Sequence, residues 1–232
     1  PGSGDKPVPM EHLLVDVGLS AEELATQVRA GDLISFAQPP LEMGDHFLAG
    51  HSLDNRASVA ALTVCLDELR HSTHDWDVWA VATVQEEETL GGAFNTAFEL
   101  HPDVAIAMDV TFAKGPGAAD YRAFPLDGGP TLGWGPDMHP ALHRRFKDLA
   151  ERLDMPHAVE LAPIYSGTDA MAMQIVAEGI PSMVVSIPLR YMHTPVELIS
   201  LHDISRAGHL LAQFIRELPV SFTQTLRAEW QA

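Results

Sequence analysis

Three consecutive carboxylates, Glu86, Glu87 and Glu88, follow a short apolar segment of the chain. That segment, Val78 to Val84, carries no charge and is rich in valine, which predicts a strand buried on both faces of a parallel sheet. Adjacent carboxylates repel one another, so their position at the end of a buried strand indicates a nearby cation. For any single Glu, the alternative is a strand that simply ends in a solvated loop.

Other residue types that bind metals occur where further elements are expected to begin or end. Asp109 lies within the apolar stretch 104–110, and His193 follows the apolar stretch 183–187. Asp54 precedes a helix-forming run of Ala, Val and Leu. Because ligands of open α/β sheets bind at the carboxyl ends of the strands, we expect these side chains to meet at one rim.

Each of these residues also has an ordinary structural explanation. Asp54 could be a helix N-cap, Asp109 a buried carboxylate that accepts from backbone donors, and His193 a hydrogen-bonded loop histidine. One dinuclear site explains them together. Two divalent cations about 3.5–4 Å apart need a bridging carboxylate, further carboxylates and imidazoles, and a free carboxylate that exchanges protons. Mixed Asp, Glu and His ligation suits zinc, and also cobalt or manganese.

The elements that would position these residues alternate between strands and helices. This alternation predicts an α/β fold in which a sheet forms the middle of three layers and helices cover both faces. In the opening region, short strands are predicted at 13–17 and 33–36, around a helix at 21–30 that Ser20 caps. The remaining predicted strands are 78–84, 104–110, 159–164 and 183–187, and the remaining helices are 55–70, 92–100, 140–153, 169–178 and 204–218.

Composition narrows the class of protein further. The 232 residues are 46% apolar, enough for a full core, and no apolar run reaches the roughly 20 residues of a membrane span. With 32 acidic and 14 basic residues, the net charge of −18 argues against nucleic acid or an anionic membrane as a partner. The single cysteine, Cys65, excludes a disulfide framework and favours a cytoplasmic location.

Several segments, in the right order and over nearly the whole chain, resemble the dinuclear-metal glutamyl/deblocking aminopeptidases. This is the tetrahedral aminopeptidase family, and some of its members carry an endoglucanase label. The segments that carry the resemblance are Val15–Gly18, Leu53–Arg56, Thr83–Glu87 with Gly92-Ala93, Asp109–Thr111, Gly167–Ala170 and Ile187–Pro195.

The resemblance implies a role for each candidate residue. Asp54 would bridge two divalent metal ions, of which zinc is the first choice. Glu87 and His193 would complete one metal, Asp109 would bind the other, and Glu86 would be the general base. The implied reaction is hydrolysis of the N-terminal peptide bond of a peptide by metal-activated water.

The resemblance also implies a domain organisation and an assembly. Residues 46–232 would form the catalytic α/β domain, which is zinc-peptidase-like. Residues 1–45 would be a remnant of a small inserted β-barrel-like domain. Members of the family form homo-oligomers, in which dimers assemble into twelve-subunit tetrahedral shells.

One family motif has no counterpart here. The family carries an early His-x-Asp motif whose histidine completes the Asp109 metal, and neither His12 nor His46 is followed by that pattern. His51 is a weak substitute, so we expect a longer native protein, in keeping with a chain that starts at Pro1. Glu88-Thr89 also replaces a small apolar residue and Gly, which leaves the substrate preference open.

Two alternatives to the aminopeptidase remain. A glycosidase would need only two carboxylates about 5–10 Å apart and no metal. A non-catalytic scaffold or peptide-binding homologue would keep the fold with an incomplete metal site. Sensitivity to chelators and the number of metals bound per subunit distinguish these alternatives.

Overall fold

The computed structural model describes residues 8–118 and 122–230, in two units that divide between Ala37 and Gln38. In the first unit, helix α1 (Ala21–Gln27) begins at a capping box, because Ser20 Oγ accepts from the Glu23 N–H and the Glu23 carboxylate accepts from the Ser20 N–H. A single 3₁₀ turn, η1 (Met10–His12), precedes it. The assignment of this region to an inserted domain stays a prediction.

The two strands predicted in the opening region, 13–17 and 33–36, are wrong. Residues 8–37, the described part of this unit, contain no strand. Leu14 and Leu33 are almost fully exposed, at 95% and 101%. An apolar run becomes a strand only where a neighbouring strand pairs with it, and this unit provides none among its described residues.

The second unit is built around a mixed sheet, which confirms the predicted α/β class. Its two longest strands form a parallel pair, β3 (Ala105–Phe112) and β6 (Ser182–Arg190), in register from Ala105↔Ser182 to Phe112↔Leu189. The remaining strands are β1 (Leu41–Met43), β2 (Phe47–Gly50), β4 (Thr131–Trp134), β5 (Ala158–Leu161) and β7 (Glu197–Ser200). Along the edge that faces away from β3, β6 pairs antiparallel with β4 and with β7. The strand order is β1-β2-β7-β6-β4-β5.

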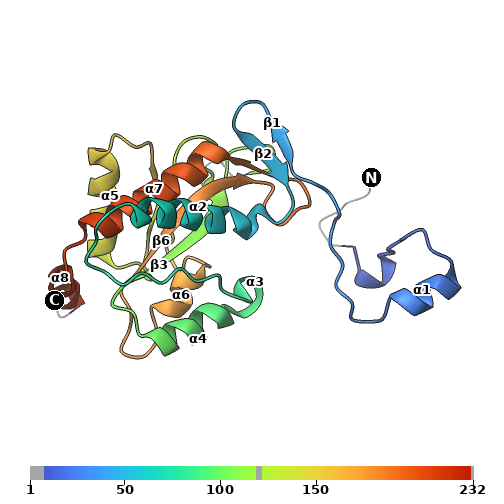
Figure 1. Cartoon of the computed structure of the whole chain (residues 1–232), viewed down its shortest axis with the longest axis horizontal. Helices are drawn as coiled ribbons and strands as arrows, with labels where there is room; N and C mark the ends of the chain where they lie inside the picture. The colour runs from blue at the N-terminus through green and yellow to red at the C-terminus, as the bar shows by residue number, and fades with distance from the viewer. Residues whose placement is uncertain (1–7, 119–121, 231–232) are drawn as a thin grey trace. The chain divides into compact units, whose positions relative to one another are not determined.

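Helices cover both faces of this sheet (Figure 1). The long helices α2 (Leu53–Arg70) and α7 (Leu201–Glu217) run together over one face, and α5 (Pro140–Arg152) packs beside α7. On the other face lie α4 (Gly91–Leu100) and α6 (Asp169–Met173). The short helix α3 (Glu86–Thr89) precedes α4, and α8 (Phe222–Trp230) ends the described chain.

The core lies between β6 and the α2–α7 pair. Alternate residues of β6, Met183, Val185 and Ile187, are fully buried. The two helices pack closely because residue 208 is a glycine: a Cβ atom there would lie 2.4 Å from the carbonyl oxygen of Ala61. This packing fixes the start of α2, which carries Asp54, relative to β3 and β6.

The predicted strand at 78–84 is also wrong. The segment forms no ladder hydrogen bonds, and Trp79 and Val84 are 70% and 68% exposed. Within the described chain β3 pairs only with β6, so its second edge carries no strand. Residues of 77–83 and of β3 line a common cavity of about 590 Å³. The segment is therefore apolar, but it lies beside a cavity rather than beside a partner strand.

Several boundaries differ from those predicted. Ser52, rather than Asp54, is the N-cap of α2, and α6 ends at Met173 instead of continuing to 178. The strand β4 lies between the predicted strand 104–110 and the predicted helix 140–153, where no strand was predicted. None of the helices described is long and apolar enough to cross a membrane.

Candidate metal centre

A tight turn presents Glu86 and Glu87 at the end of the 78–84 segment. Gln85 has a φ of 62°, and the one-turn helix α3 follows it directly. The chain then folds back so closely that a Cβ atom at residue 92 would lie 2.4 Å from the Val84 nitrogen. Gly92 is therefore required for this turn, which places the two carboxylates at the rim of the sheet.

Asp54 and His193 also lie in irregular backbone. Asp54 belongs to the first turn of α2, but its ψ of 104° is not helical and its peptide bond to Asn55 is cis. His193 lies in the turn after β6 and has a φ of 63°. Both side chains thus lie in irregular backbone at the end of a regular element, Asp54 where α2 begins and His193 just after β6. Active-site residues commonly lie in such backbone.

Asp54, Glu87 and His193 converge and form what we call the metal group. The Nε2 atom of His193 lies 3.1 Å from Asp54 Oδ2 and 3.2 Å from Glu87 Oε2. Ligand atoms bound to one tetrahedral ion at 2.0–2.2 Å lie about 3.3–3.6 Å from one another, close to these separations. The Asp54 side chain is 7% exposed, whereas those of Glu87 and His193 are 54% and 63% exposed. The group is therefore accessible from one side.

Asp109 lies outside the metal group, but it lines the same second cavity as Asp54, Glu87 and His193. It is 8% exposed, and its Oδ1 accepts from Asn55 Nδ2 at 2.9 Å and from the Val110 N–H at 2.8 Å. The cavity has a volume of about 210 Å³. The residues predicted for the site that line it are Asp54, Glu86, Glu87, Asp109 and His193. The weak substitute ligand His51 contacts Ser52 Oγ instead and does not line this cavity.

Three carboxylates of this cavity, Asp54, Glu86 and Asp109, have raised pKa values. Burial, reinforced by the charge of Glu87, raises the pKa of Asp54 to about 6. Burial, reinforced by the charges of Asp169, Glu87 and Asp54, raises the pKa of Glu86 to about 7. For Asp109, burial raises the pKa to about 8 against the opposing Val110 N–H. Negative charge is thus crowded and under-compensated here, as expected where a cation binds.

The donor set fits a divalent cation. Two carboxylate oxygens and one imidazole nitrogen lie mutually within 4.8 Å, and this combination suits zinc, cobalt or manganese. Asp169 adds a further observation: Thr83 Oγ1 donates to its Oδ2 at 2.7 Å, while its Oδ1 is buried with no hydrogen-bond partner in the described part of the chain. The metal group therefore suits one divalent ion of the kind that the sequence predicts.

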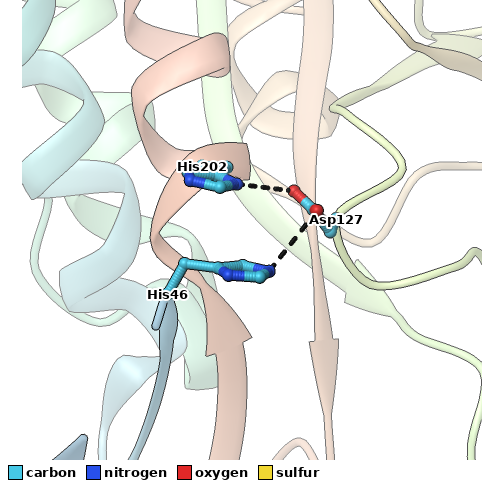
Figure 2. Close-up of side chains that lie close together, drawn as sticks. All are labelled: His46, Asp127 and His202. Carbon is cyan, nitrogen blue, oxygen red and sulfur yellow. Dashed lines mark hydrogen bonds and ion pairs between the residues drawn. The ribbon is translucent and has the colours of Figure 1, made fainter. Parts of the chain in front are cut away.

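A second histidine–carboxylate group, His46, Asp127 and His202, is built differently (Figure 2). In this Asp127 cluster, His202 Nδ1 lies 3.1 Å from Asp127 Oδ1, and His46 Nε2 lies 3.4 Å from Oδ2. The two rings are stacked, with planes 6° apart and centroids 4.3 Å apart. A ring nitrogen binds a metal in the plane of its ring, so one ion cannot lie in both planes. Arg206 Nη1 also donates to Asp127 Oδ1 at 2.8 Å and supplies a cation already.

Sequence reasoning missed two residues that contact this site. Asn55 donates a hydrogen bond to Asp109, and its position directly after Asp54 was the feature of the sequence that could have indicated this role. Glu197 accepts from the backbone N–H groups of Leu53, Asp54 and His193, and no sequence pattern pointed to it.

Comparison with known proteins gives the class to which this fold and site belong. The sequence pattern of the M42 glutamyl aminopeptidase family matches residues 2–210. The chain belongs to the M42 glutamyl aminopeptidase family.

Individual relatives agree with this assignment. The chain is 38% identical over 216 residues to the lysyl aminopeptidase of Pyrococcus furiosus, covering 92% of this chain and 62% of that protein. An aminopeptidase structure from Desulfurococcus kamchatkensis superimposes with a TM-score of 0.83 at 34% identity, covering 91% of this chain and 61% of that one. For the Pyrococcus horikoshii TET1 peptidase the TM-score is 0.75 at 25% identity, with 93% and 64% covered. The chain thus spans a little over three fifths of the length of these relatives.

Proposed function

We propose that the protein containing this chain is a metal-dependent aminopeptidase that hydrolyses N-terminal residues from peptides. The observation that carries the proposal is the convergence of Asp54, Glu87 and His193 at 3.1–3.2 Å in a member of the M42 glutamyl aminopeptidase family. The lysyl aminopeptidase of Pyrococcus furiosus supports the same reaction class by its name.

The metal group would hold one divalent ion, with Asp54 bridging to a second ion bound by Asp109. Zinc is the first choice for both, and cobalt or manganese would suit the same ligands. When bound, the ions supply Lewis acidity, which activates water and polarises the scissile carbonyl. The histidine of the family's early His-x-Asp motif has no counterpart in residues 1–45 and would complete the Asp109 site from elsewhere in the protein.

Glu86 is the proposed general base. It lines the cavity without belonging to the metal group, and its pKa of about 7 lets it take up and release a proton near neutral pH. Its carboxylate would accept a proton from the attacking water and donate it to the leaving amine. The open side of the cavity, where Glu87 and His193 are exposed, would admit the substrate.

The relatives also suggest how the protein assembles. The Pyrococcus horikoshii TET1 peptidase is described as able to assemble into a tetrahedron or a large octahedral shell. We therefore propose a homo-oligomer, with dimers assembling to a dodecamer, and the molar mass in solution tests this directly. A cytoplasmic location stays a prediction.

The test of the activity is metal removal from the full-length protein. The protein is dialysed against a chelator and assayed on an unblocked peptide, on the same peptide with an acetylated N-terminus, and on a β-glucan. A metal-dependent aminopeptidase cleaves the unblocked peptide, loses this activity without metal and regains it with zinc or cobalt, and a deblocking aminopeptidase also cleaves the acetylated peptide. Glucan hydrolysis that survives the chelator would indicate a glycosidase, and metal-free protein that never cleaves peptides would indicate a scaffold.

A further inference from the structure

Glu197 is a buried carboxylate at the first position of β7. Its side chain is 2% exposed. The antiparallel register of β2 and β7 pairs Gly50 with Glu197, next to the point where the chain leaves β2 and continues into α2. The turn that carries His193 immediately precedes β7. Glu197 therefore lies between the two backbone segments that carry Asp54 and His193.

Both carboxylate oxygens of Glu197 accept from the backbone of these segments. Oε2 accepts from the N–H groups of Leu53, at 2.6 Å, and Asp54, at 3.2 Å. Oε1 accepts from the N–H of His193 at 3.1 Å. The first N–H groups of a helix have no intrahelical acceptor, and His193 lies in a left-handed turn. One side chain thus supplies acceptors to two segments that would otherwise hold unpaired donors.

We propose that Glu197 is a positioning residue that fixes the separation of Asp54 and His193 and thereby sets the metal affinity of the metal group. The proposal rests on the proposed function, since it assumes that these two side chains bind the same ion. Glu197 does not reach the ion itself, because both of its oxygens face backbone donors. It acts on the ligands through the backbone that carries them.

A carboxylate suits this place because the three hydrogen bonds that Glu197 makes to the described residues all come from N–H donors. The amide of glutamine keeps one acceptor oxygen and presents an NH₂ group to the other segment. In Glu197→Gln, either the Leu53–Asp54 segment or His193 therefore loses its acceptor and moves. Loss of a group that orients metal ligands typically weakens metal binding about 10–100-fold.

Asp203 provides a matched control for the loss of a buried carboxylate. It is fully buried, and it accepts from the N–H groups of Asp127 at 2.7 Å and Gly129 at 2.8 Å and also from Arg206 Nη1 at 3.0 Å. Asp203→Asn makes the same chemical change as Glu197→Gln, in a segment that carries no metal-group residue. A general loss of stability should appear in both variants, whereas a loss of ligand positioning should appear only in Glu197→Gln.

The experiment titrates Co²⁺ into the metal-stripped full-length protein and its variants and follows the cobalt absorption spectrum, with thermal unfolding measured in parallel. We expect the dissociation constant for Co²⁺ to rise about 10–100-fold in Glu197→Gln. We expect it to stay at the parent value in Asp203→Asn. Saturating cobalt should restore part of the peptidase activity of Glu197→Gln. Under these conditions, its kcat should differ from the parent value by a larger factor than its KM does.

Other outcomes would overturn the inference. An unchanged Co²⁺ affinity in Glu197→Gln, or an equal loss of affinity in Asp203→Asn, would show that Glu197 has no specific role in positioning. If Glu197→Gln does not fold, Glu197→Asp, which keeps the charge but is one methylene shorter, is titrated instead, and parent-like affinity there would equally contradict it. A parent protein that binds no Co²⁺ would refute the proposed function itself.

Discussion

The metal group and the Asp127 cluster contain the same kinds of side chain at similar distances, and they differ in what balances the charge. In the metal group, two carboxylates share one histidine, and the pKa of Asp54 is raised to about 6 by burial and by Glu87. In the Asp127 cluster, burial acts to raise the pKa of the carboxyl, but the hydrogen bonds from His202 and Arg206 outweigh it and the pKa lies below its usual value.

A cation site differs from other clusters of the same residue types in that its negative charge is not already balanced by a nearby side chain. Histidines and carboxylates near one another are common, and an arginine or lysine beside them already satisfies the negative charge. Arg206 does this for Asp127, and the stacking of His46 on His202 leaves no common position for an ion. No such cation contacts the metal group among the described residues. Variants of the two groups should therefore behave differently.

The largest contrast is expected from removing the central carboxylate of each group. Asp54→Ala should lose bound metal, and turnover should fall to the background rate, because Asp54 is the proposed bridge between both ions. Asp127→Ala should keep the metal content and the activity of the parent. Elemental analysis of the purified full-length variants, with peptide hydrolysis, checks both. A normal metal content in Asp54→Ala would remove Asp54 from the site.

Glu86→Gln should separate binding from chemistry within the metal cavity. The variant keeps the ligands and therefore the metal content, but it lacks the proposed general base. Turnover should fall about 10²–10⁴-fold, the usual contribution of a positioned base. Steady-state rates at saturating peptide and metal measure the effect. Near-parent turnover would show that another group takes the proton.

The carboxylates of the metal cavity and the Asp127 cluster should also give stability an opposite dependence on pH. The pKa values of Asp54, Glu86 and Asp109 are raised to about 6, 7 and 8, so the folded state binds their protons more tightly than the unfolded state does. Their contribution to stability is therefore lost as the pH rises from about 4, the ordinary carboxyl value, to about 8. Bound zinc should offset this loss. The melting temperature of metal-free protein should fall over this range, and added zinc should restore it at pH 8; a flat metal-free profile would contradict the account.

The smallest expected effect concerns the Asp127 cluster itself. Its lowered pKa means that Asp127 stabilises the fold above its ordinary pKa of 3.8, and that this stabilisation is lost as the pH falls through the lower folded value. At pH 7, Asp127→Asn should cost about 1–2 kcal/mol through the weakened hydrogen bond from Arg206. Asp67→Asn, in an exposed pair with Arg70, should cost under about 0.5 kcal/mol. Urea unfolding of both variants measures the difference, and equal costs would show that the cluster contributes no more than a surface ion pair.

Much of the fold and the residues of the cavity could be predicted from the sequence, because they follow long, strongly patterned elements. The β3 and β6 segments carry uninterrupted apolar runs, so Asp109 within one and His193 after the other stood out. The structure brings Asp54, Glu87 and His193 into contact, while the role assigned to each residue stays a prediction.

What could not be predicted depends on pairing between distant segments. The 78–84 segment has the composition of a buried strand, but composition does not specify a partner strand, and β3 offers it none within the described residues. The strands β2 and β7 are four residues long, too short for a reliable alternating pattern. Because Glu197 depends on the register of these two strands, its contacts with the backbone of Asp54 and His193 were not visible in the sequence.

The most direct test of the contrast is anomalous diffraction at the zinc edge from crystals of the zinc-loaded full-length protein. The account predicts an anomalous peak between Asp54, Glu87 and His193, a second peak beside Asp109, and none at His46, Asp127 and His202. A peak confined to the Asp127 cluster, or no peak at the metal group, would contradict it.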